Sequence, residues 1–116
     1  MVDLSFNFGL AIVEFTDELQ GKKKFAVANR LLRSGTSVGA NIWESQNAES
    51  KRDFIHKLKI AAKEGEETEY WLLLCKHSIN YPDPDELLDT LKSINKILNK
   101  IITTSKGTMN HRSETN

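Results

Sequence analysis

Carboxylate and amide side chains occur at helical spacing in the middle of this chain, where they could support catalysis or metal binding. Asn41 and Glu44 are three residues apart on one face of a helix, and Glu67 lies midway along the helix expected next. An unpartnered carboxylate is costly to bury, so inward-pointing side chains must share hydrogen bonds. The sequence predicts a structural polar network of Ser37, Asn41, Glu44 and Glu67, with Arg33 as a further candidate member, that fixes the register of two helices.

The spacing of the reactive residues does not match three familiar kinds of active site. A di-iron centre in a helical bundle needs Glu-x-x-His on two helices and two further glutamates, but the chain offers only Asp53-x-x-His56. Helical nucleases of the HEPN type space Arg and His more widely than Arg52 and His56. Cys75 lies in an apolar run, without the residue grouping of a nucleophilic site. We expect no enzymatic activity, no metal, no cofactor and no small-molecule substrate.

Length and composition are those of a single domain. The 116 residues are enough for one hydrophobic core, and one cysteine excludes an intrachain disulfide. No apolar run approaches the roughly 20 residues that cross a bilayer, and the N-terminus lacks the pattern of a secretory signal. We expect a cytoplasmic protein without membrane contact.

Charge is unevenly distributed along the chain, although the formal net charge is zero. Residues 21–60 hold nine Lys and Arg against three Asp and Glu, and residues 61–90 hold two against eight. Solvated helix faces explain such a pattern, and a basic surface for RNA phosphates is the sharper alternative. The candidate RNA-contacting residues are Lys22, Lys23, Lys24, Arg30, Arg33, Lys51, Arg52, Lys57 and Lys59.

Apolar residues at helical spacing predict four helices. Stripes of this kind are Phe8, Ile12, Phe15 and Leu19 in the first helix, and Leu87, Leu91, Ile94 and Leu98 in the last. The predicted helices end at Gly21, near Gln46, before Asn80 and before Gly107. Because short connections favour antiparallel neighbours, we predict an all-α, antiparallel, up-down-up-down four-helix bundle. It covers residues 1–104, and residues 105–116 form a flexible C-terminal tail.

Three glycines and three aromatic residues indicate close contacts. Each interior glycine costs a helix about 1 kcal/mol relative to alanine, so Gly35, Gly39 and Gly65 are expected to let the second and third helices approach closely. Large aromatic side chains on the flank of a bundle are enriched at protein interfaces, although the first helix is an alternative cover. The candidate oligomer interface consists of Trp43, Tyr70 and Trp71.

A longer pattern spans two of the predicted helices. It consists of Ser37-Val38, Asn41-Ile42, Glu44, Lys51-Arg52, Asp53-Phe54-Ile55, Glu67, Tyr70 and Leu72. This pattern resembles that of the 23S rRNA intervening-sequence proteins, also called four helix bundle proteins. Trp43-Glu44-Ser45 stands where that family more often has Ala-Glu-Gly. The resemblance implies a four-helix protomer that assembles into a homopentameric ring and has no enzymatic activity.

The family is also similar to the accessory variability determinant of diversity-generating retroelements, a markedly basic pentamer that partners a reverse transcriptase and contacts RNA. The expected function is therefore that of a non-enzymatic oligomeric scaffold associated with RNA or ribonucleoprotein. Its expected partners are further copies of the chain and structured RNA. The alternative is a protein-binding adaptor, such as an accessory subunit of a reverse transcriptase, without direct RNA contact.

Overall fold

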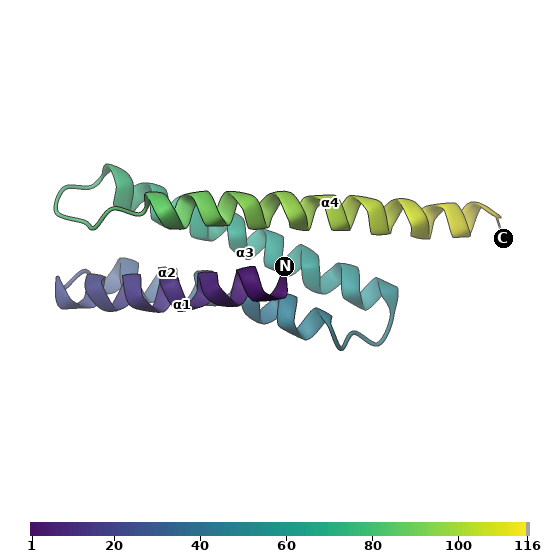
Figure 1. The fold of residues 1–116 in the computed structure, drawn as a ribbon, viewed down its shortest axis with the longest axis horizontal. Coiled ribbons are helices and arrows are strands. Elements are labelled where there is room, and N and C mark those ends of the chain that lie inside the picture. The colour runs from purple at the N-terminus through teal and green to yellow at the C-terminus, as the bar shows by residue number, and fades with distance from the viewer. Residues whose placement is uncertain (116) are drawn as a thin grey trace.

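Four α-helices make up the fold in the computed structural model (Figure 1). The structure describes the backbone of residues 1–115 and the side chains of residues 1–107. This part of the chain contains no β-strand, which confirms the predicted all-α class. The helices are α1 (Val2–Gly21), α2 (Phe25–Ser45), α3 (Lys51–His77) and α4 (Asp85–Thr115).

Each helix packs mainly against its neighbours in the sequence. α2 packs against both α1 and α3, and α4 packs against α3 and, less extensively, against α1. The α1–α2 and α3–α4 connections lie at one end of the molecule, and the α2–α3 connection lies toward the other (Figure 1). Within the described residues α1 does not pack against α3, so these two helices occupy opposite corners of the bundle.

The core is built from the apolar stripes that the sequence predicts. On the first and last helices the buried side chains include Phe8, Ile12, Phe15, Leu19, Leu87, Leu91, Ile94 and Leu98. They pack with side chains of α2 and α3 in one hydrophobic cluster. Since burial of a Leu, Ile or Phe side chain contributes about 1.5 to 3 kcal/mol, this cluster is the main source of stability.

Two glycines of α2 allow this helix to lie close to α1. A Cβ atom on Gly39 would be 3.0 Å from the backbone oxygen of Ser5, and one on Gly35 would be 2.9 Å from the side chain of Ile12. Gly65 of α3 faces α4 in a similar way. The glycines therefore permit close approach, but toward α1 and α4 rather than between α2 and α3 as predicted.

Side-chain caps fix the starts of the last two helices. Ser50 Oγ accepts a hydrogen bond from the backbone N–H of Asp53 at 3.0 Å. The Asp53 carboxylate in turn accepts from the N–H of Glu49, one residue before the cap. Asp83 Oδ1 accepts from the N–H of Asp85 at 3.0 Å. These bonds satisfy backbone donors that a helix start leaves free.

The C-terminal helix is longer than the sequence pattern predicts. α4 has 31 residues and continues through Gly107 to Thr115, so its predicted end is wrong. A single glycine costs about 1 kcal/mol but does not block helical hydrogen bonds as proline does. The side chains of residues 108–116 lie outside the described part, and the flexibility of the segment 105–116 stays a prediction.

Candidate functional site

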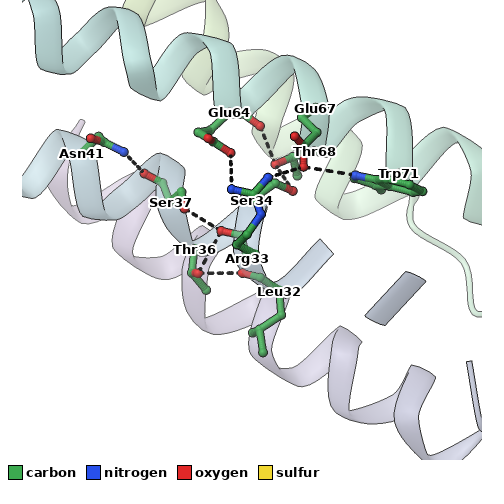
Figure 2. A network of polar contacts seen from close by, with 10 residues as sticks. All are labelled: Leu32, Arg33, Ser34, Thr36, Ser37, Asn41, Glu64, Glu67, Thr68 and Trp71. Carbon is green, nitrogen blue, oxygen red and sulfur yellow. Dashed lines mark hydrogen bonds and ion pairs between the residues drawn. The ribbon is translucent and has the colours of Figure 1, made fainter. Parts of the chain in front are cut away.

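A cluster of polar side chains joins α2 to α3 (Figure 2). The Arg33 guanidinium donates to Glu67 Oε2 at 2.6 Å and forms an ion pair with Glu64 Oε2 at 3.5 Å. Trp71 Nε1 donates to the same Glu67 oxygen at 3.3 Å. The hydrogen bond that Arg33 donates to Glu67 and the negative charge of Glu64 raise the pKa of Arg33. Because the Arg33 side chain is 55% exposed, solvent screens this cluster.

A pair of hydroxyl groups lies beneath this cluster, inside the bundle. Thr68 Oγ1 is 3.0 Å from Ser34 Oγ and 2.7 Å from the backbone oxygen of Glu64. Both hydroxyl-bearing residues are fully buried. Neither residue was among the predicted site residues, although Ser34 follows buried Leu31 at helical spacing, on the same face. This pair, rather than a carboxylate, provides the buried polar link between α2 and α3.

The other residues of the predicted polar network remain on α2. Ser37 Oγ donates to the backbone oxygen of Arg33 at 2.6 Å, and Asn41 Nδ2 donates to the backbone oxygen of Ser37 at 2.8 Å. Glu44 is exposed. It lies two residues after buried Ile42, which turns it about 200° around the helix and away from the core. The structure therefore brings Glu67 to Arg33, and does not bring Ser37, Asn41 or Glu44 to Glu67.

Large apolar side chains are exposed along one side of α1 and α2. Phe6, Leu10, Val13 and Trp43 border an open groove of about 340 Å³, and we call these four residues the apolar face. The rings of Phe6 and Trp43 are 6.4 Å apart. Of the four, only Trp43 was among the predicted interface residues. The spacing of the other three, at i, i+4 and i+7, is the signal of a second apolar stripe on α1.

The two remaining aromatic candidates lie on α3. Tyr70 is exposed, and its ring packs edge-on against that of Trp71 with 5.2 Å between centroids. Trp71 is half-buried, and the Arg30 guanidinium lies 5.9 Å from the centre of its ring. Trp71 is thus largely engaged within its own chain, whereas Trp43 and Tyr70 present apolar area to solvent.

The nine candidate RNA-contacting residues do not form one surface. They divide into Lys22, Lys23 and Lys24 at the α1–α2 connection, Arg30 and Arg33 along α2, and Lys51, Arg52, Lys57 and Lys59 on α3. A helix of 21 residues, the length of α2, spans about 30 Å and separates the first group from the third. Both arginines of α2 already contact side chains of α3. The basic block of the sequence therefore corresponds to two distant basic regions.

Two negative findings concern the described residues only. They contain no group of three His, Cys, Asp or Glu side chains placed as metal ligands would be. Their helices include none with the length and apolar character required to span a membrane.

Comparison with known proteins relates the chain to a family. Residues 1–103 match the family model of the 23S rRNA-intervening sequence proteins. A crystal structure of a protein of unknown function from the S23 ribosomal protein family of Bacteroides thetaiotaomicron is similar, with a TM-score of 0.82 and 41% sequence identity. The match covers 87% of this chain and 96% of that one. None of the curated proteins matches.

Proposed function

Because this chain belongs to the 23S rRNA-intervening sequence protein family, we propose that it is a homo-oligomeric, non-enzymatic scaffold associated with RNA or a ribonucleoprotein. In this proposal, up-down-up-down protomers assemble into a ring of five in the cytoplasm. The observation that carries the proposal is the apolar face of α1 and α2.

The apolar face supports self-association because of its exposure. Phe6, Leu10 and Trp43 are each more than half exposed, although they are large apolar residues that border one groove. Contiguous apolar patches of this kind are uncommon on monomers and mark interaction sites. A second copy of the chain that covers these side chains would remove their apolar area from water.

A closed ring joins two different surfaces of each protomer, since each copy contacts one neighbour on either side. Tyr70, Leu73 and Leu74 on α3 are exposed and provide a second apolar surface. Because α1 and α3 occupy opposite corners of the bundle, the two surfaces are well separated. This arrangement favours head-to-tail assembly over a symmetric dimer.

Association with RNA is supported by the family relationship and by the basic regions at the ends of the bundle. The family name refers to sequences that interrupt 23S rRNA. Lysine and arginine contacts to RNA phosphates release counterions, so the affinity is expected to fall steeply with salt.

The proposal is tested by measuring the mass in solution with light scattering, before and after nuclease treatment. We expect about 66 kDa for the nuclease-treated protein, five times the 13.2 kDa of one chain. Binding of structured RNA is then measured at low and high salt. A monomer at micromolar concentration, or RNA affinity that does not change with salt, contradicts the proposal.

The second apolar surface also favours one alternative function. If Tyr70, Leu73 and Leu74 bind another protein rather than a second copy, the chain is an adaptor, such as an accessory subunit of a reverse transcriptase. A protein partner that remains bound after nuclease treatment and is lost on Leu74→Lys, without a change in oligomer mass, distinguishes this function from the first.

A further inference from the structure

A small cavity lies between the first half of α3 and the C-terminal part of α4. It has a volume of about 190 Å³ and is lined by Arg52, Ile55, His56, Lys59 and Lys106. Four of these five side chains are basic, and none is acidic. Ile55 is buried and contributes an apolar wall. The volume corresponds to several water molecules, so a hydrated phosphate group fits.

Among the described side chains, none neutralises the positive charges around this cavity through an ion pair. The ion pairs of the described residues involve Arg33 and Lys76, and none involves Arg52, Lys59 or Lys106. Lys106 lowers the pKa of Lys59, first through its charge and then through a side-chain hydrogen bond. Two ammonium groups are therefore held close enough to repel one another, an arrangement that a bound anion stabilises.

The sequence around the cavity residues contributes further lysines rather than acidic side chains that could balance the charge. Asp53 is the acidic residue nearest to the cavity in the sequence of α3, and its carboxylate is turned back to the N–H of Glu49 at the helix start. Between Asp89 and Gly107, α4 contains no acidic residue. The same stretch contains Lys92, Lys96, Lys100 and Lys106.

We propose that the cavity lined by Arg52, His56, Lys59 and Lys106 binds a phosphate group of an RNA strand. Arginine offers a planar fork of donors to phosphate oxygens, and lysine adds a mobile point charge. The His56 ring contributes a further N–H donor from the same helix face. This inference rests on the proposed association with RNA and assigns it to one place on the protomer.

The basic residues that line the cavity are not the same set as the basic block predicted from the sequence. The cavity unites Arg52 and Lys59 with His56 and Lys106, neither of which was among the candidate RNA-contacting residues. The sequence pattern that indicates the α3 side of the cavity is a basic stripe at i, i+4 and i+7, formed by Arg52, His56 and Lys59. Lys106 is 47 residues beyond Lys59 in the chain and becomes its neighbour only through packing of α4 on α3.

The test compares two triple variants that remove the same number of positive charges. Arg52→Gln/Lys59→Gln/Lys106→Gln alters the cavity, and Lys22→Gln/Lys23→Gln/Lys24→Gln alters the α1–α2 connection at the far end. RNA affinity is measured by fluorescence anisotropy with a labelled structured RNA, a hairpin with a single-stranded overhang, over a range of salt concentrations. We expect the cavity variant to lose at least about tenfold in affinity at low salt, and its salt slope to fall by up to roughly 2. The variant of the α1–α2 connection should retain most of the RNA affinity and most of its salt dependence.

A second measurement separates an RNA phosphate from free phosphate. Inorganic phosphate should raise the melting temperature of the wild-type protein above that in chloride at equal ionic strength, because a ligand that binds only the folded state stabilises it. The cavity variant should melt cooperatively and lose this shift.

The possible results lead to different conclusions. Equal loss of RNA affinity in both triple variants, or no loss in the cavity variant, overturns the inference and leaves the RNA-associated function standing. Phosphate stabilisation of the wild type alone, without any RNA binding, identifies a free-phosphate site and overturns the RNA-associated function. Loss of both responses in the cavity variant alone supports the inference.

Discussion

Ser34 and Thr68 form the buried polar link between α2 and α3, and the consequences of removing it are measurable. Thr68→Val keeps the shape of the side chain but leaves the buried Ser34 hydroxyl without its partner. We expect the free energy of unfolding to fall by about 1 to 2 kcal/mol, as for other buried groups that lose a hydrogen bond. Urea denaturation of wild type and variant measures the difference.

A double variant provides the control for this pair. Ser34→Ala/Thr68→Val removes both hydroxyl groups, so it should be more stable than the sum of the two single changes predicts. Strictly additive losses would show that the 3.0 Å contact contributes no coupling.

Cys75 provides a residue-scale prediction with a defined pH dependence. Burial raises the pKa of its thiol to about 11, and the residue is 1% exposed. Only the thiolate reacts readily, so at pH 8 the folded protein should react with a thiol reagent at least about a hundredfold more slowly than the urea-unfolded protein. The native rate should rise with pH up to about 11, as the thiolate fraction increases. Similar rates for the folded and unfolded chain would contradict this prediction.

The sequence predicted some of the site residues but not their surroundings. The spacing of Asn41 and Glu44 indicated one helix face, but spacing alone does not determine which neighbouring element that face meets. Glu67 finds a charged partner in Arg33, whereas Glu44 faces solvent. The hydroxyl pair was missed because serine and threonine at core positions resemble ordinary small polar residues in a sequence.

At the scale of elements, the positions of the first three helices follow closely from local signals. Apolar periodicity places the buried stripes, and the Ser50 cap marks the start of α3. Local sequence signals did not predict which helix each glycine faces. Whether Gly35 faces α1 or α3 depends on the rotation of α2 in the bundle, and packing of all four helices determines this rotation.

Substitution of Gly35 tests whether stability depends on the close approach of α1 and α2. Gly35→Ala would place a Cβ atom within 3.0 Å of three carbon atoms of Ile12, which is fully buried. Overpacking of this kind costs about 1 to 3 kcal/mol, and the gain in helix propensity offsets about 1 kcal/mol. We therefore expect a lower melting temperature by circular dichroism.

Gly9 is the matched control on α1. A Cβ atom there would meet no atom of another helix of the same protomer within 4 Å, so Gly9→Ala should gain helix propensity without a clash inside the protomer. We expect an increase in stability of up to about 1 kcal/mol. A stabilising effect at both positions would mean that α1 and α2 separate without cost.

At the scale of the whole molecule, the apolar face provides the test of assembly. Leu10→Lys places a charge in the middle of the groove, and Leu10 is 52% exposed within one chain, so the protomer itself should remain folded. We expect the oligomer to dissociate and the mass by light scattering to fall toward that of one chain. Circular dichroism should retain the helical signal.

Ile79→Lys is the corresponding control for this change. Ile79 is 85% exposed in the α3–α4 connection and does not border the groove, so the same substitution there should leave the mass unchanged. Dissociation of both variants would indicate a general effect of charge. An unchanged mass for Leu10→Lys would exclude this face from the oligomer interface.

The arrangement of the whole molecule also separates residues that a sequence window groups together. Lys24 and Arg52 belong to one basic block in the sequence, but α2 places them near opposite ends of the bundle. Lys59 and Lys106 are distant in sequence and close in space. Charge counts along the chain therefore identified a basic tendency, but the location of the cavity depends on the packing of α3 and α4.

The packing of each helix mainly against its sequence neighbours has a kinetic consequence. Most tertiary contacts close short loops, so little chain entropy is lost before favourable contacts form. Helical proteins of low contact order fold in microseconds to milliseconds. Folding of the protomer should therefore be much faster than the concentration-dependent assembly that we propose, and association would then be the slow step in forming the oligomer.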